Sequence, residues 1–168
     1  MFGEGAREVM DVYRKTYSDK HIADLFYLDY WFRVLVDKYL TIKCEGSDTP
    51  NYCYLLTYDF AYNGGLPAWH SSDLMLVFRS AEVVPVYHEP GAMKLQDQMS
   101  TSWSNFAKTG DPNSDLIPKW TPYRPADRNT MVFDIECAEK CNFDRELMEV
   151  ANKYGQRPGF RFRQVKQY

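Results

Sequence analysis

The feature that most constrains the fold of this chain is a shortage of strands beside long, strongly apolar helical segments. In several segments apolar residues recur at three- and four-residue spacing, the pattern of amphipathic helices. These predicted helices cover about 6–17, 21–42, 73–78, 91–109 and 144–153, whereas only 52–58 and 130–134 are predicted as strands. Because a sheet usually has about four to six strands, the chain is expected to be one part of a larger α/β layered fold.

The strand predicted at 52–58 is the best defined of the two. It is apolar on both faces, as a central strand covered by helices would be. A loop over 59–72, containing glycine and proline, follows it, and Gly110 stands at a natural C-cap position for the helix at 91–109. Strands set between helices, with few hairpin signals, predict an α/β class with two or three strands of an incomplete sheet.

The composition excludes several classes of protein. The 168 residues have the length of one domain, and 45% hydrophobic against 26% charged residues supports a packed core rather than disorder. The formal net charge is −3, from 20 Lys and Arg against 23 Asp and Glu. No strongly basic surface is therefore expected, and nucleic acid is excluded as a partner.

No segment is predicted to enter a membrane or to direct secretion. The apolar run at 74–78 is far too short to span a bilayer, and the N-terminal residues are polar, unlike a signal peptide. We therefore expect no membrane partner and favour a cytoplasmic location. Residues of about 154–168 form a basic tail, for which a solvated end is predicted. Its basic residues include Arg157, Arg161, Arg163 and Lys166.

The cysteines are not spaced as metal ligands, and no metal or cofactor is expected. None of them forms a CxxC pair, so free thiols are the preferred interpretation. A metal-dependent hydrolase that uses His70, His88 and the cysteines is a third alternative, but no ligand spacing supports it. The four cysteines are Cys44, Cys53, Cys137 and Cys141.

His70 is the candidate for catalysis. It stands near the end of the loop that follows the predicted buried strand, and loops at the carboxyl ends of such strands carry the sites of α/β folds. Trp69 is adjacent and is a candidate for the wall of a substrate pocket. From its position alone, a loop histidine is more often structural than catalytic. His21, at a helix start, and His88, before a helix, are expected to be solvated.

No partner for a histidine base is evident in the chain. A serine hydrolase needs a nucleophile and an acid beside the histidine, yet no serine lies in the G-x-S-x-G turn that exposes such a nucleophile. Ser71 and Ser72 are too close in sequence to His70 to be presented opposite it, and one of them is expected to cap the helix at 73–78.

Two segments carry specific motifs. Residues 64–78 read GGLPAWHSSDLMLVF, and residues 103–113 read WSNFAKTGDPN. The first resembles the catalytic-histidine region of the type-B carboxylesterases, the family that includes the cholinesterases. The second matches the W-x-N-F-A-x-T-G-x-P-N signature of that family at every specified position. Weaker similarities keep the same order. They are D-x-x-F at 29–32, Y-x-Y-x-F at 52–56 with Leu56 in place of Phe, W-P-x-Y at 120–123 with the proline one place later, and a strand at 130–134 that is similar to the bacterial branch.

The resemblance implies an α/β-hydrolase fold and a carboxylic ester hydrolase of the serine–acid–histidine type, with residues 1–168 as its C-terminal segment. His70 is the one triad member with a matching position, and the serine, the oxyanion loop and the acid are expected upstream of Met1. The implied partners are a small-molecule carboxylic ester and that missing N-terminal part, without which the chain would be inactive. Glu4 and Asp59 are the acids in this chain that could substitute, while Asp73 is interpreted as a supporting or capping residue.

Two residues after His70 differ from those usual in the family. The family usually has Gly where this chain has Ser71, and commonly Glu where it has Asp73.

The alternative function is a non-catalytic, self-associating interaction module derived from the same fold, which would form homo-oligomers. A truncated segment would expose apolar positions that normally face a sheet. These positions are Leu25, Phe32, Leu35 and Val36.

Overall fold

Among the residues that the computed structural model describes, 1–155, the chain forms five α-helices. They are α1 (Ala6–Thr16), α2 (Tyr30–Gly46), α3 (Leu74–Val77), α4 (Pro90–Thr109) and α5 (Arg145–Tyr154). Short 3-10 segments lie at Gly3–Gly5, Ile22–Tyr27, Tyr62–Gly64, Ala81–Val83 and Pro85–Tyr87. No helix in this part of the chain is both long and apolar enough to cross a membrane. The basic residues named for the tail lie outside the described residues.

The main sheet has three strands in the order β1-β4-β5, namely β1 (Cys53–Leu56), β4 (Thr130–Phe133) and β5 (Ala138–Lys140). β1 runs parallel to β4, and β5 runs antiparallel to β4. A separate hairpin of β2 (Asp59–Phe60) and β3 (Leu66–Pro67) lies in the predicted loop. The incomplete α/β sheet is confirmed, but β1 is not central here, because it pairs along one edge only within residues 1–155.

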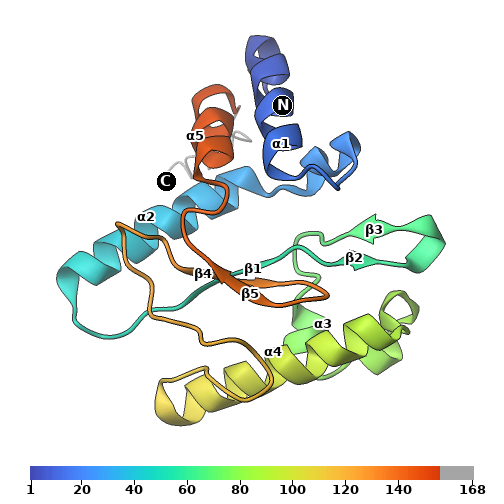
Figure 1. Cartoon of the computed structure of the whole chain (residues 1–168), viewed down its shortest axis with the longest axis vertical. Coiled ribbons are helices and arrows are strands. Elements are labelled where there is room, and N and C mark those ends of the chain that lie inside the picture. Colours follow the sequence, from blue (N-terminus) through green and yellow to red (C-terminus); the bar gives the residue numbers. More distant parts are fainter. Residues whose placement is uncertain (156–168) are drawn as a thin grey trace, which may run out of the picture.

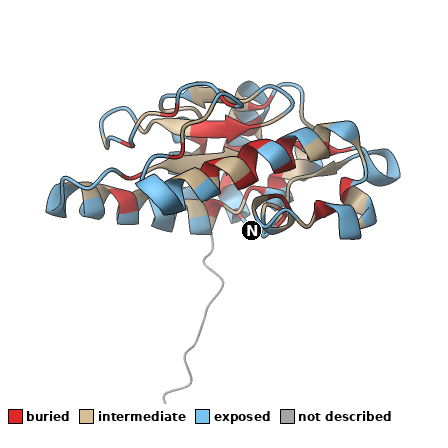
Figure 2. Ribbon diagram, turned by 90° about the horizontal axis from the view of Figure 1, so that it is seen from below, coloured by how far each residue is buried: buried red, intermediate tan, exposed pale blue. Residues whose placement is uncertain are grey.

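The sheet lies between α2 on one side and α3 and α4 on the other (Figure 1). Side chains alternate between the two faces of a strand, so Met131 and Phe133 of β4 both point into the core beneath α4. There they meet Leu76, Leu95 and Met99, and all five side chains are almost completely buried. In Figure 2 buried residues, in red, lie on a strand of the sheet and at intervals along the helices that flank it. This burial is the main apolar stabilisation of the sheet.

The W-x-N-F-A-x-T-G-x-P-N segment ends α4 and fastens the chain that follows it. Gly110 has a φ of 78°, the left-handed conformation of a C-cap glycine, as predicted. The Asn105 side-chain amide donates to the carbonyl of Asn113 at 2.8 Å. Asn113 in turn accepts from the Trp120 backbone N–H at 2.7 Å, and the Trp120 indole donates to the carbonyl of Cys53 at 3.1 Å. The motif therefore ties the end of α4 to β1 and has a structural role.

The single helix predicted over about 21–42 is wrong, because two separate segments occupy this range. Residues 22–27 form a 3-10 helix, and α2 begins only at Tyr30. Asp29 lies between them with a φ of 49°, a left-handed conformation through which an α-helix cannot continue. The 3-10 segment is capped by His21 and Asp24, whose side chains accept the backbone N–H groups of Ala23 and His21 at 3.2 and 3.1 Å.

A second apolar core lies between α1, α5 and the 3-10 segment at 22–27. Val9, Leu147 and Ala151 are completely buried there, and Leu25 packs against the same cluster. The expectation that Leu25 is exposed is therefore wrong, because α1 and α5 supply a cover for it.

One face of α2 remains apolar and open to solvent. Its side chains follow one another at three- and four-residue spacing, which places them on one side of the helix. Their exposed fractions run from 37% to 68%. The exposure expected for Phe32, Leu35 and Val36 is confirmed. The residues of this α2 stripe are Phe32, Leu35, Val36, Tyr39 and Ile42.

A buried ionic cluster joins α2 to the second core. The Arg33 guanidinium lies 2.5 Å from Oδ2 of Asp144, and the Tyr17 hydroxyl donates to the same oxygen at 2.7 Å. Burial, reinforced by the charge of Asp144, raises the pKa of the Tyr17 hydroxyl, which therefore keeps its proton and remains a donor. The residue that follows α1 and a residue of α2 thus converge on one carboxylate, which stands directly before α5.

We predict that Asp144→Ala lowers the free energy of unfolding by about 3 kcal/mol, because it leaves the buried Arg33 charge without its partner. Urea unfolding followed by tryptophan fluorescence measures this change. Glu146→Ala is the matched control on the same helix, because Glu146 pairs with Lys15 at the exposed surface. Its cost should stay below about 0.5 kcal/mol. Equal costs for the two variants would contradict the buried-pair interpretation.

Candidate active site

His70 lies beside the sheet, at the end of the segment that follows β1. Because β1 and β4 are parallel, their carboxyl ends meet at one edge, and the β2–β3 hairpin leads the chain from that edge back to His70. His70 lines the same cavity as the β1 residues Tyr54, Leu55 and Leu56. This cavity has a volume of about 840 Å³ and lies between α2, β1, the His70 segment and the start of α5. The histidine therefore has the location that α/β folds give to their sites.

The imidazole of His70 has a different environment at each of its nitrogens. Nδ1 lies 2.9 Å from Oδ2 of Asp29. The Phe32 ring stacks on the imidazole with centroids 4.5 Å apart and an angle of 24° between the planes. Nε2 has no hydrogen-bond partner within residues 1–155, and 57% of the His70 side chain is exposed. Nε2 is thus free to exchange a proton with a group that enters the cavity.

The sequence did not single out Asp29 as the acid beside His70. Of the two acids considered as substitutes, Glu4 lies exposed in the N-terminal 3-10 turn, and Asp59 pairs with Lys20 at 2.7 Å. Neither contacts His70. The available signal is the D-x-x-F spacing at 29–32, which by itself predicts a helix start and not a contact with a residue 41 positions away.

The backbone after His70 explains one departure from the family. Ser71 has a φ of 71°, in the left-handed region that glycine adopts without strain, so the position favours the family's glycine. The predicted serine cap of α3 is wrong, since Asp73 holds the N-cap position and no side-chain hydrogen bond caps α3. Ser72 is buried instead, where its hydroxyl accepts from the Trp69 N–H at 3.2 Å and its carbonyl accepts from the Tyr87 hydroxyl at 2.8 Å.

Asp73 holds the His70 segment against β1. The Tyr54 hydroxyl donates to Oδ2 of Asp73 at 2.5 Å. Burial, together with this hydrogen bond, raises the pKa of the Tyr54 hydroxyl, so Tyr54 stays a donor. The carboxylate three positions after the histidine therefore acts on the strand in this structure and not on the imidazole.

The aromatic residues near His70 differ in their surroundings. The ring of Trp69 packs between Phe60 and Tyr87, with centroid distances of 5.4 and 6.0 Å, and the residue also lines the cavity. Its role in substrate binding stays a prediction. Phe78 also closes the first motif segment, and its side chain is 74% exposed on the surface.

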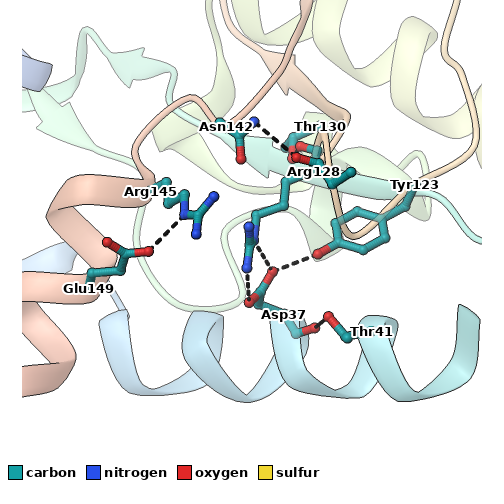
Figure 3. Close-up of polar contacts among 9 residues, drawn as sticks. Asp37, Thr41, Tyr123, Arg128, Thr130, Asn142, Arg145 and Glu149 are labelled. Carbon is teal, nitrogen blue, oxygen red and sulfur yellow. Dashed lines mark hydrogen bonds and ion pairs between the residues drawn. The ribbon is translucent and has the colours of Figure 1, made fainter. Parts of the chain in front are cut away.

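A polar network fixes the far end of the cavity. The Tyr123 hydroxyl and Nε of Arg128 both reach Oδ1 of Asp37 on α2, at 2.6 and 2.8 Å, so that two side chains from one loop converge on a single carboxylate (Figure 3). Burial opposes the charge of Asp37, but the hydrogen bonds from Arg128 and Tyr123 outweigh it and hold the pKa of the carboxyl below its usual range.

The remaining histidines and the cysteines do not gather around His70. Nε2 of His88 lies 2.7 Å from the carbonyl of Glu82, and the four cysteines are free. Across the described part of the chain, no three His, Cys, Asp or Glu side chains are grouped so that they could hold a metal ion.

Sequence comparison matches this chain to known esterases and lipases. The model of the carboxylesterase family matches residues 9–154. Human bile salt-activated lipase is 28% identical over 134 residues, which cover 71% of this chain and 18% of that protein. The bovine lipase of the same name is 34% identical over 93 residues, or 52% of this chain and 16% of that protein. The chain thus spans about a fifth of the length of such relatives.

Structural comparison gives the same fold. An esterase from the anaerobe Clostridium hathewayi, described as able to hydrolyse aliphatic aromatic polyesters, superposes with a TM-score of 0.78 at 34% identity. The match covers 91% of this chain and 30% of that esterase. A thermophilic PNB esterase matches with a TM-score of 0.54 at 21% identity, over 60% of this chain and 22% of that protein, and supports the fold alone.

We predict that Ser71→Gly raises the free energy of unfolding by about 0.5–1 kcal/mol, because glycine relieves the left-handed strain at this position. Urea unfolding of the full chain measures the change. Ser72→Gly is the neighbouring control and should destabilise the protein, because it removes the acceptor of the Trp69 N–H. Destabilisation by both substitutions would contradict the strain argument.

We predict a pH-dependent effect for Asp37→Asn. A carboxyl whose pKa is lowered on folding contributes stability that is present above its ordinary value of 3.8 and is lost as the pH falls through the lower, folded value. The variant should therefore be less stable than the wild type near neutral pH, with a difference that shrinks below pH 3.8. Urea midpoints measured between about pH 7 and pH 3 test this prediction. Asp48→Asn, in the exposed turn after α2, is the control and should leave the stability unchanged. A difference for Asp37→Asn that does not vary with pH would contradict the prediction.

Proposed function

The chain belongs to the carboxylesterase family, and from this premise we propose that residues 1–168 are the C-terminal segment of a serine carboxylesterase domain in which His70 is the general base. The observation that carries the proposal is the environment of one side chain. His70 has a carboxylate beside Nδ1, Nε2 has no hydrogen-bond partner among residues 1–155, and the residue lines a cavity of about 840 Å³. A histidine base in a serine hydrolase needs this division between its two nitrogens.

The proposed reaction is the hydrolysis of a carboxylic ester through an acyl-enzyme. Nε2 of His70 accepts the hydroxyl proton of a serine outside this chain while the serine oxygen attacks the ester carbonyl carbon. Nε2 then gives the proton to the alcohol oxygen, which leaves, and the acyl group stays on the serine. In the second half of the reaction a water molecule gives a proton to Nε2 and attacks the acyl carbon. The carboxylic acid leaves, and Nε2 returns the proton to the serine oxygen. Because the serine, its oxyanion donors and the triad acid are all expected from the part upstream of Met1, we expect no ester turnover by this chain alone.

We propose that the missing N-terminal part of the domain packs against the open side of this segment. Within residues 1–155, β1 has one edge without a partner strand, and the α2 stripe has no apolar cover. An unpaired strand edge and an exposed apolar face both gain free energy from such packing. In this arrangement the missing part would meet the cavity that His70 lines.

The α2 stripe also favours the alternative function. A second copy of the chain could cover these five apolar side chains, as a non-catalytic module that forms homo-oligomers would require. The two functions differ in what covers the stripe, and this difference can be tested together with catalysis.

We predict that this segment supports catalysis when it is supplied with the rest of a family domain. A chimera is made by exchanging the corresponding part of the Clostridium hathewayi esterase, 34% identical, for this chain. It should hydrolyse p-nitrophenyl butyrate, and His70→Ala in the chimera should lower kcat/KM by about a thousandfold, because the general base is lost.

His88→Ala is the matched control, since His88 is bonded to the Glu82 carbonyl away from His70, and it should leave the turnover within about twofold of the chimera. A folded His70→Ala chimera with full turnover would show that His70 is not the base. A folded chimera that lacks turnover and dimerises through the α2 stripe in sedimentation would favour the interaction module. Turnover by the isolated chain would contradict the assignment of the nucleophile to another part.

A further inference from the structure

The turn that carries His70 is closed by its own hydrogen bonds. The Ser72 backbone N–H donates to the Trp69 carbonyl at 2.9 Å, and the Trp69 N–H donates to the Ser72 hydroxyl at 3.2 Å. His70 and Ser71 are therefore the central residues of a four-residue turn. Ser71, the third residue of this turn, has a φ of 71°, whereas the φ of His70 is not positive. This is the pattern of a type II turn, which favours glycine at its third position.

The serine at the third position places strain in the turn. A left-handed residue other than glycine costs free energy and persists only where the surrounding structure compensates for it. Relaxation of Ser71 to a negative φ would rotate the peptide groups around it and move His70 relative to Ser72. More than half of the His70 side chain is exposed, so the place of the imidazole depends strongly on the backbone that carries it. The contacts that hold the turn therefore also place His70.

Two tyrosine hydroxyls hold the end of this turn from different elements. The Tyr87 hydroxyl, from the 3-10 segment before α4, donates to the Ser72 carbonyl at 2.8 Å. The Tyr54 hydroxyl, from β1, donates to Oδ2 of Asp73 at 2.5 Å. We name these two hydrogen bonds the tyrosine anchors. They reach the two residues that directly follow the strained Ser71.

The rings that carry the anchors are themselves fixed by aromatic packing. Tyr87 is 2% exposed, and its ring centroid lies 5.0 Å from that of Phe60. The Tyr54 ring packs edge-on against Trp103 of α4, with centroids 4.7 Å apart. Burial raises the pKa of both hydroxyls, that of Tyr87 to about 12, so both keep their protons and remain donors. The anchors therefore connect the turn to the core through fixed donors.

We propose that Tyr54 and Tyr87 are positioning residues, whose hydroxyls hold the strained turn 69–72 in place and so fix the backbone of His70 beside the cavity. The inference rests on the proposed role of His70 as general base. Both tyrosines act through the residues that follow Ser71. Strain and anchors are then coupled, because Ser71→Gly removes the strain and with it the need for the anchors.

The first test is the hydrogen exchange of the Ser72 N–H in the ¹⁵N-labelled full chain, because this N–H closes the turn. Tyr87→Phe should speed its exchange by about tenfold, since the lost hydrogen bond lets the strained turn open more often. In the Ser71→Gly background the same substitution should change the exchange by less than about twofold. Unchanged exchange in Tyr87→Phe, or equal acceleration in both backgrounds, overturns the proposal.

The Tyr54 anchor is tested from the side of the turn, because a substitution of Tyr54 itself would also disturb the core. Asp73→Ala removes the acceptor and should speed the exchange of the Ser72 N–H by about tenfold. No side-chain cap of α3 is lost with it. Asp73→Asn should keep the wild-type exchange, since its amide oxygen still accepts the bond. Exchange that is unchanged in Asp73→Ala, or accelerated equally in both variants, overturns this half of the proposal.

Tyr17→Phe is the matched control for a general loss of stability. Tyr17 is a buried tyrosine whose hydroxyl also donates to a carboxylate, that of Asp144 beside the second core. Its loss should leave the exchange of the Ser72 N–H and the turnover of the chimera within about twofold of the parent values. Acceleration as large as in Tyr87→Phe would show that the exchange reports opening of the whole chain, and would overturn the proposal.

In the chimera, the anchors should affect the chemical step rather than substrate binding. Tyr87→Phe should lower kcat for p-nitrophenyl butyrate by about tenfold, because a small displacement of a catalytic group is costly. KM should stay within about twofold. Ser71→Gly should restore most of the lost kcat. A raised KM with unchanged kcat, or no restoration by Ser71→Gly, overturns the positioning role.

Exchange and turnover together separate the anchors from the proposed function. The expected exchange in a chain whose chimera has no turnover would leave the anchors standing and remove the esterase role. An active, His70-dependent chimera in which Tyr87→Phe changes neither the exchange nor kcat would do the reverse.

Discussion

The parallel pairing of β1 with β4 is the interaction on which the rest of this structure depends. The paired strands are separated by more than seventy residues, with Cys53 opposite Thr130 and Leu56 opposite Phe133. Parallel strands require a crossover, and here the crossover contains the hairpin, the His70 segment, α3 and α4. α4 buries one face of the sheet, while His70 returns to line a cavity beside β1. Both the core and the site therefore follow from one strand register.

α2 connects this sheet to the second core through Tyr30, which packs in that core, and through polar contacts. Arg33 reaches Asp144 and Asp37 reaches Arg128, and these two positions lie one helical turn apart. With that polar side fixed inward, the apolar α2 stripe faces solvent, and the first turn presents Asp29 and Phe32 to His70. One helix orientation thus explains the exposed face, the cavity wall and the contacts of the imidazole.

The segment that matches the family most strictly is not the segment that contains the candidate catalytic residue. The segment at 103–113 matches a specific signature, yet its side chains end α4 and bond to the chain before β4. The His70 segment matches less strictly, with Ser71 in place of glycine, and its positive φ shows why glycine suits this position. The turn after α4 is fixed by the positive φ of Gly110 and by the hydrogen bonds of Asn105 and Asn113, whereas the chemistry is proposed for a single side chain that follows β1.

Local patterns in the sequence determined four of the five helices, two of the strands, the Gly110 helix end and the selection of His70 as a candidate, because periodicity, capping and loop position act over a few residues. They failed for the helix expected over about 21–42, which the left-handed Asp29 interrupts, and for the serine cap of α3. Only the tertiary structure decided that Asp29 meets His70, that Asp73 meets Tyr54 instead, and that Leu25 is buried while Leu35 is not. The physical reason is that each of these outcomes depends on residues far apart in the chain, which the strand pairing and the packing of α2 bring together.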